Sequence, residues 1–269
     1  MLKAAFGSAL ACALVALGLS QPTSAPSYDN LNAVLWMQTA VEYTASTTQT
    51  YRLARKALLH GLRDSHWTAA LEQNGDFEKL PPAVILDLDE TVLDNSVFEA
   101  RTVTAAEGYS RTAWSKWEEE RSAGLVPGSM DFLQFARANG VMPIYITNRV
   151  CDSAREDDPT VQTLQKLHVP LDSPVERLFC AKDPKDSDKT PRRKLVAAKF
   201  RILLLFGDQL GDFLTIPANE ATLEGRESLF QAHQSLWGER WFQLPNPMYG
   251  SWEAAVGFTV PEKLKHLRQ

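Results

Sequence analysis

The stretch from residue 83 to residue 91 constrains this chain more than any other. It begins as a short apolar run after two prolines and runs into acids at Asp87 and Asp89. A run of this length, bounded by a breaker, is typical of a buried strand in a parallel sheet. Ligands of open α/β sheets bind beyond the carboxyl ends of the strands, so both acids are expected at a functional site. Two carboxylates this close repel each other unless a cation lies between them, and Mg²⁺ is a usual choice.

Other strand ends in the chain carry polar residues of a similar kind. Taken alone, two acids after a strand are equally consistent with a solvated turn. Two more apolar runs, at residues 142–147 and 202–207, also end in polar side chains. These are Thr147 and Asn148 after the first run, and Asp208 and Asp212 after the second. The repetition favours a common site over a solvated turn.

Predicted helices alternate with these strands. Helices are expected between Ser129 and Asn139, at 159–168 and at 190–200, with a further strand at 177–181. Such alternation is typical of a parallel sheet with helices on both faces. The sequence therefore predicts the α/β class, with a doubly wound, mostly parallel sheet.

Four segments of the chain resemble, in order, the motifs of the haloacid dehalogenase (HAD) superfamily of phosphatases. Residues 87–91 resemble its first motif, DxDx[TV], and the segments around Thr147, Lys189 and Asp208 follow. The resemblance implies a HAD-like core.

A narrower resemblance comes from the two ends of the matched region. The segment around Trp36 and the segment 245–253, Pro-Asn-Pro-Met-Tyr-Gly-Ser-Trp-Glu, are similar to bacterial class C (lipoprotein e-type) acid phosphatases, which include 5'-nucleotidases. This resemblance spans roughly residues 30–255. It implies hydrolysis of phosphate monoesters.

The resemblance implies roles for the acids. Asp87 is expected to attack phosphorus and form an aspartyl-phosphate, while Asp89 protonates the leaving oxygen and then activates water. Mg²⁺ is expected to be bound by Asp87, Asp208 and the backbone carbonyl of Asp89, with Asp212 hydrogen-bonding its waters. Thr91 is expected to position this segment through hydrogen bonds.

Other residues are expected to hold the phosphate. By the same resemblance, Thr147 and the backbone of Asn148 bind phosphoryl oxygens, and Lys189 neutralises the phosphate charge. Lys182 and Lys185 compete for the role of the lysine. We favour Lys189 because the residues after it lead directly into a helix.

An insertion at about 92–126 is expected to form a small helical cap over the strand ends. Its predicted helix carries Trp114 and Trp117 on one face, and both fit a core role equally well. By resemblance, Trp114 and Tyr249 stack on the nucleobase of a nucleoside monophosphate or on the ring of an aryl phosphate. A site entrance lined by aromatic side chains is also compatible with a broad-specificity acid phosphatase that has no nucleotidase preference.

The first 80 residues divide into two predicted segments. Residues 1–25 read as a signal peptide, which implies a secreted or periplasmic protein; lipidation at Cys12 and membrane attachment remain open. Residues 26–80 are expected to form a helical segment, with one long helix from about 30 to 63 and a short helix and loop at 64–80. The phosphatase domain is then expected at 81–269.

Charge and cysteine content restrict the alternatives. A net charge of −5 argues against a general nucleic-acid binder, but Arg149, Arg192 and Arg193 lie near the motifs. Arg192 either orients an acid or is solvated. Cys151 and Cys180 each follow a predicted strand; a disulfide and two reduced thiols are both compatible with the sequence.

Two hypotheses follow for the function. The first is a secreted Mg²⁺-dependent acid phosphatase that acts on small phosphorylated substrates. The second is a non-catalytic binding or storage protein with the same fold. Asp87, the expected nucleophile, favours the first.

Overall fold

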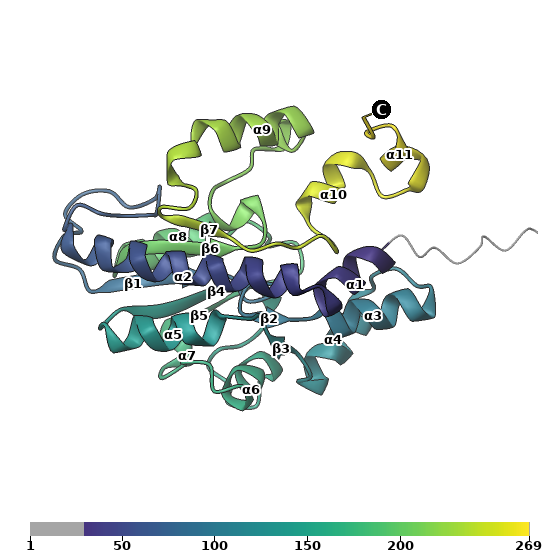
Figure 1. The fold of residues 1–269 in the computed structure, drawn as a ribbon. Helices are drawn as coiled ribbons and strands as arrows, with labels where there is room; N and C mark the ends of the chain where they lie inside the picture. Colours follow the sequence, from purple (N-terminus) through teal and green to yellow (C-terminus); the bar gives the residue numbers. More distant parts are fainter. Residues whose placement is uncertain (1–29, 269) are drawn as a thin grey trace, which may run out of the picture.

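The computed structural model describes residues 30–268. The predicted signal peptide and Cys12 lie outside the described residues. The chain forms an α/β structure around a five-stranded sheet of order β5-β4-β1-β6-β7, in which every pair of neighbouring strands is parallel (Figure 1). The strands are β1 (Pro82–Leu86), β4 (Met142–Val150), β5 (Leu178–Ala181), β6 (Arg201–Gly207) and β7 (Trp241–Gln243). The predicted fold class is confirmed.

Both faces of this sheet are buried, as the continuous apolar strands require. Alternate residues of β1 belong to different cores: Val84 and Leu86 to one, Ala83 and Ile85 to the other. The first core lies under α2 (Val41–Arg63) and α5 (Ser129–Ala138), which pack on each other. The second includes residues of α8 (Thr190–Ala197). α6 (Pro159–Lys166), α7 (Pro174–Arg177) and α9 (Leu223–Ala232) complete the outer layers.

The N-terminal helical segment is not one continuous helix. The chain forms α1 (Leu31–Thr39) and α2, separated at Ala40, whose backbone is extended. α1 packs on α3 of the insertion, whereas α2 packs on α5 and β6, so the break lets each helix meet a different partner. The predicted apolar stripe is buried along α2, at Tyr43, Thr47, Tyr51, Ala54 and Leu58.

Residues 64–80 contain no helix, contrary to the prediction. Long-range hydrogen bonds hold this loop against β6 and the end of α8 instead. Trp67 Nε1 donates to the carbonyl of Leu203, and Gln73 both donates to the Ala197 carbonyl and accepts from the amide of Ile202. The Trp67 and Gln73 side chains thus pair with backbone groups of β6 and of the end of α8.

The insertion contains two helices rather than the single predicted one. They are α3 (Ser96–Ala105) and α4 (Arg111–Glu120), enclosed by the short antiparallel pair β2 (Leu93–Asp94) and β3 (Gly124–Leu125). Figure 1 shows α3 and α4 at the same end of the molecule as α1 and the C-terminal helices α10 (Ser251–Val256) and α11 (Val260–Leu264).

Three 3-10 turns complete the described elements: η1 (Leu210–Asp212), η2 (Ala218–Glu220) and η3 (Gln234–Leu236). Among the described helices, none has both the length and the apolar character needed to cross a membrane.

Candidate active site

Three carboxylates meet where β1 and β6 end. Asp87 follows β1, Asp208 follows β6, and Asp212 lies in η1 just beyond. One oxygen from each lies within 4.8 Å of the others, and all three residues are 7% exposed. A side chain at Gly207 would collide with Asp212, since a Cβ there would lie 2.2 Å from Asp212 Oδ2. The close approach of Asp212 to the end of β6 therefore requires glycine.

Lys189 reaches this cluster from the N-terminus of α8. Its Nζ donates to Asp87 Oδ1 and, at 2.6 Å, to Asp212 Oδ1. The side chain is buried, whereas Lys182 and Lys185 are exposed. Of the three lysines considered from the sequence, the structure brings Lys189 to the acids.

Burial dominates the electrostatics of the cluster. It raises the pKa of Asp87 to about 7, against the lowering effect of Lys189, while the charges of Asp212 and Asp89 add to the rise. Burial, then the charges of Asp212 and Asp87, raise the pKa of Asp208 well above its usual range. For Lys189, burial opposes the charged form, but Asp212 and Asp87 outweigh it and raise the pKa of the ammonium. The cluster has more negative charge than Lys189 alone can balance.

The donor set fits a divalent cation. Asp87 and Asp208 present carboxylate oxygens, which Mg²⁺ and similar hard ions prefer. Asp212 uses Oδ1 to accept from Lys189 and Oδ2 to accept from the amide of Gln209, at 2.9 Å. Asn246 donates to Asp208 Oδ2 at 2.8 Å and so helps to fix that carboxylate. A cation bound here would offset the burial and the carboxylate repulsion that together raise the pKa values of Asp87 and Asp208.

Asp89 points toward the cap rather than into the carboxylate cluster. Its Oδ1 accepts from Arg149 Nη2 at 2.7 Å and from Arg149 Nε at 3.0 Å. Asn95 Nδ2 donates to the same oxygen at 2.9 Å, and Asn95 Oδ1 accepts from Arg149 Nη2 and Trp117 Nε1. The Arg149 guanidinium also lies 5.3 Å from the centre of the Trp114 ring. Arg149 thus joins the end of β4 to both Asp89 and the cap.

Thr91 contacts the N-terminal helix through its backbone. Its carbonyl accepts from the Tyr51 hydroxyl at 2.7 Å, and the Tyr51 ring stacks on Phe206 of β6. The Thr91 hydroxyl itself has no hydrogen-bond partner in the described chain. Thr91 therefore helps to position this segment through its backbone carbonyl.

Thr147 and Asn148 occupy different environments. Thr147 is fully buried, and its hydroxyl accepts from the amide of Arg149 at 3.1 Å. Asn148 is exposed and lines the cavity above the acids. Arg192 donates to the Thr147 carbonyl and to Asn148 Oδ1, so it supports this turn and is buried rather than solvated.

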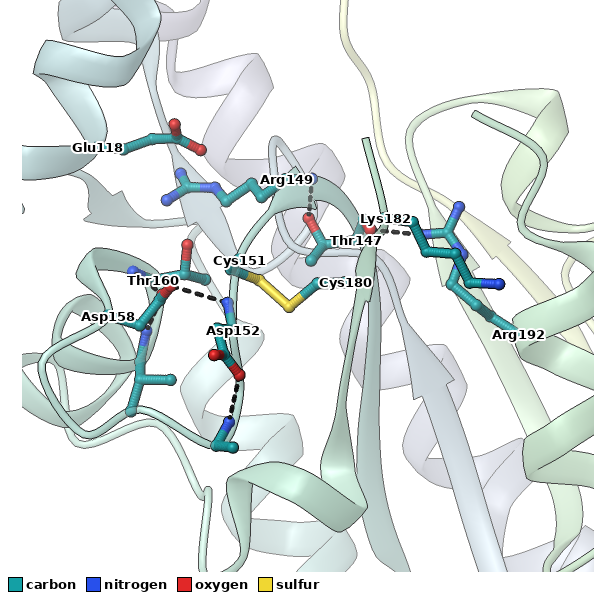
Figure 2. The surroundings of a disulfide bond; sticks show 12 residues. Glu118, Thr147, Arg149, Cys151, Asp152, Asp158, Thr160, Cys180, Lys182 and Arg192 are labelled. Carbon is teal, nitrogen blue, oxygen red and sulfur yellow. Dashed lines mark hydrogen bonds between the residues drawn. A yellow bond between two sulfur atoms is a disulfide. The ribbon is translucent and has the colours of Figure 1, made fainter. Parts of the chain in front are cut away.

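A disulfide joins the two strands beside this turn. Cys151 follows β4, Cys180 lies in β5, and their Cα atoms are 5.5 Å apart. The pairing of β4 with β5 is interrupted after Ile146 and resumes at Val150, so Thr147, Asn148 and Arg149 form the irregular part of β4. Figure 2 shows the disulfide next to this irregular part of β4, with Arg149 directed toward the cap. Of the two alternatives left open by the sequence, the structure has the disulfide.

A large cavity lies above the strand ends. Its volume is about 1270 Å³, and its lining includes Asp87, Lys189, Trp114 and Tyr249. Trp114 is only 8% exposed and packs edge-on against Phe98, with ring centres 5.1 Å apart. Both predicted aromatic residues reach the cavity, although most of Trp114 is in the core.

Sequence reasoning missed several residues of this site. Arg149 was noted only as a nearby charge, and Asn95, Gln209 and Asn246 were not singled out. Asn95 lies six residues after Asp89, and Arg149 lies two residues after Thr147. Closeness to these motif residues is a weak local signal of a functional role. The pairing of Arg149 with Asp89 joins residues far apart in the chain, and only the folded structure reveals it.

Comparisons with known proteins show the family and the fold of this chain. The chain matches the family model of the HAD superfamily, subfamily IIIB (acid phosphatase), over residues 8–252. It is similar to the solved structure of the class C acid phosphatase from Bacillus anthracis, with 33% identity and a TM-score of 0.74 over 90% of this chain and 98% of that chain. The class C acid phosphatase from Bacillus anthracis with tungstate bound gives 31% identity and a TM-score of 0.76, with the same coverage.

Proposed function

The chain belongs to the acid phosphatases of HAD subfamily IIIB, which are phosphoric monoester hydrolases, and we propose that Asp87 is its nucleophile. The observation that carries this proposal is the buried contact of Asp87 with Lys189 beside Asp208, at the base of the cavity. A carboxylate held there faces any phosphate ester that enters. The tungstate-bound relative supports an anion site in this fold.

In the proposed reaction, a carboxylate oxygen of Asp87 attacks phosphorus and the ester P–O bond breaks. Asp89 gives its proton to the leaving oxygen, then takes a proton from the water that attacks the aspartyl-phosphate. Arg149 and Asn95 fix the orientation of the Asp89 carboxyl. Lys189 lies against Asp87 and balances the charge of the bound phosphoryl group.

We propose Mg²⁺ as the cofactor. Asp87, Asp208 and the backbone carbonyl of Asp89 would hold it, with Asp212 supporting its waters and orienting Lys189. When bound, the ion supplies positive charge that keeps Asp87 ionised and offsets the charge of the phosphate.

The proposed substrates are nucleoside 5'-monophosphates and aryl phosphates. Trp114 and Tyr249 line the cavity together with the proposed nucleophile, and a cavity of about 1270 Å³ has room for a nucleotide. The leader-like residues 1–25 support secretion or a periplasmic location. A broad-specificity acid phosphatase without nucleotide preference is the second candidate, favoured by the size of the cavity, which can admit leaving groups of different shapes.

The test is release of inorganic phosphate from a panel of nucleotides, phenyl phosphate and glycerol phosphate at acidic and neutral pH. Asp87→Asn should abolish release, and EDTA should do the same until Mg²⁺ is restored. Asp76→Asn, at an exposed site, is the matched control and should leave the rate unchanged. Full activity of Asp87→Asn, or full activity in EDTA, would overturn the nucleophile or the metal assignment respectively.

A further inference from the structure

One cavity-lining arginine lies away from the carboxylate cluster. Arg226, on α9, lines the cavity that contains Asp87 and Lys189. Its Nη1 donates to Ser251 Oγ at 3.0 Å. Within residues 30–268, no carboxylate pairs with it. Partial burial of the guanidinium, with no compensating acid, lowers its pKa.

The other arginines and lysines that line this cavity have acidic partners. Lys189 pairs with Asp87 and Asp212, and Arg149 pairs with Asp89. The remaining pairs are Lys263 with Glu253, at 2.8 Å, and Arg111 with Glu118, at 4.0 Å. A half-buried cation without such a partner has unused capacity to bind an anion.

Hydrogen bonds place Arg226 near the reacting end of the cavity. Ser251, its partner, donates its amide to Gln209 Oε1 at 2.9 Å. Gln209 directly follows Asp208, and its own amide is held by Asp212 Oδ2. Hydrogen bonds through Ser251 and Gln209 therefore connect Arg226 to the residues that follow β6. A substrate with its phosphoryl group at Asp87 can extend toward this guanidinium.

We propose that Arg226 determines specificity by binding a second anionic group, a phosphate or a carboxylate, on the leaving part of the substrate. This inference rests on the proposed function for the position of the first phosphoryl group. The guanidinium presents a planar set of donors that matches either anion, and Ser251 holds it in orientation. The preferred substrates are then phosphate monoesters that carry a further negative charge.

The kinetic test compares substrates that differ only in the second charge. The first pair is phenyl phosphate and 4-carboxyphenyl phosphate; the second is a nucleoside 5'-monophosphate and its 3',5'-bisphosphate. Hydrogen bonds to charged groups contribute about 1.5–3 kcal/mol, so Arg226→Gln should raise KM about 10- to 150-fold for the doubly charged member of each pair. The kcat values, and the KM for phenyl phosphate, should change little.

Three variants separate the roles of charge, geometry and folding. Arg226→Lys should retain part of the preference, and Ser251→Ala should weaken it by releasing the guanidinium. Arg52→Gln removes the same charge from an exposed position on α2 and should leave the preference intact. If only the bisphosphate pair responds to Arg226→Gln, the second group is a phosphate; if only the carboxylate pair responds, it is a carboxylate.

A binding measurement keeps this inference separate from the catalytic proposal. Phenylphosphonate and 4-carboxyphenylphosphonate resist hydrolysis, so calorimetric titration reports binding whether or not Asp87 is the nucleophile. The wild-type protein should bind the carboxylated ligand more tightly, and Arg226→Gln should remove that difference. Equal affinity of the wild-type protein for the two ligands would overturn the inference. An equal loss of affinity for both ligands in Arg226→Gln would overturn it as well.

Discussion

The two walls of the cavity differ in how their side chains are held. On the strand-end wall, Asp87, Lys189, Asp208 and Asp212 are each less than 10% exposed. Lys189 donates to Asp87 and Asp212, and Asn246 donates to Asp208. On the outer wall, formed by the cap and residues 247–267, exposure varies: Trp114 is 8% exposed, but Tyr109 is 64% and Phe258 68% exposed. Groups that are pre-oriented and buried stabilise charge in a transition state, whereas looser aromatic surfaces adapt to different ligands. We therefore expect the chemistry at the strand-end wall and the substrate contacts at the outer wall and at Arg226 of α9.

After Asp87→Asn, the largest effect is expected at Asp89, beside the strand-end wall. Asp89→Asn should reduce kcat for alkyl phosphates by about 10²–10⁴, the usual range for general acid–base catalysis. Esters with good leaving groups need less protonation and should lose less. Steady-state rates across a series of leaving-group pKa values provide the measurement. An equal loss of kcat across the series would show that Asp89 supports structure or activates water. The strand-end wall would then lack the proposed general acid that distinguishes it from the outer wall.

The next effect concerns the support of that wall. The Cys151–Cys180 disulfide closes a loop of 29 residues, for which chain entropy predicts about 3–4 kcal/mol of stabilisation. The double variant Cys151→Ser, Cys180→Ser should lose that free energy of unfolding in urea titrations. Wild-type protein kept in reductant is the control and should unfold like the double variant. Unchanged stability of the variant would mean that β4 and β5 hold their ends without the bond.

A smaller effect is expected on the outer wall, at Glu99 of α3. Burial raises the pKa of Glu99 to about 7, against a hydrogen bond from Asn30, and the charge of Glu253 adds to the rise. Because the folded state binds this proton more tightly than the unfolded state, stability falls as pH rises from about 4.5 to about 7 and stays low above that. Glu99→Gln lacks this loss and should be more stable than wild type by about 1–3 kcal/mol above pH 7.

The measurement for Glu99 is the difference in free energy of unfolding between variant and wild type across pH 4–8. It should grow with pH and level off near neutrality. A constant difference would show that Glu99 does not titrate with folding. Glu107→Gln, at a neighbouring exposed site, is the control and should show no such trend.

The smallest expected effect is on substrate binding by Tyr249. Stacking on an aromatic side chain contributes about 1–3 kcal/mol per base, and most of it acts before and during the reaction alike. Tyr249→Ala should therefore raise KM for nucleoside monophosphates on the order of tenfold, with kcat little changed. Glycerol phosphate has no ring to stack and should respond little. The same loss for both substrates would mean that Tyr249 supports its loop rather than the base.

The catalytic motifs could be predicted because they are local. Each lies where a short apolar run stops, and the carboxyl ends of parallel strands share one edge of the sheet. The order of motifs therefore predicted the fold class and the family, both confirmed. It also predicted that Asp87, Lys189 and Asp208 would lie together, as they do in the structure, although their roles stay predictions.

The features that could not be predicted from the sequence depend on long-range contacts, which no local sequence pattern encodes. Ala40 interrupts the N-terminal helix without a proline or glycine, because α1 and α2 meet different partners. β7 is three residues long, too short to show alternation. Arg193 is fully buried in a basic helix because Glu72 and two carbonyls of η1 satisfy its guanidinium. The disulfide required β4 and β5 to be neighbours, which spacing alone does not state.

The contact of Tyr51 with Thr91 has a consequence for the order of folding. α2 is made early in synthesis, and Thr91 follows Tyr51 by 40 residues, but the β6 residue Phe206, on which Tyr51 stacks, is made only after most of the chain exists. Contacts between residues so distant in sequence form late, since the intervening chain must first lose its freedom. The catalytic segment therefore reaches its final position only when both the N-terminal helix and β6 are in place. A chain that lacks α2, or that ends before β6, should therefore accumulate as an inactive intermediate.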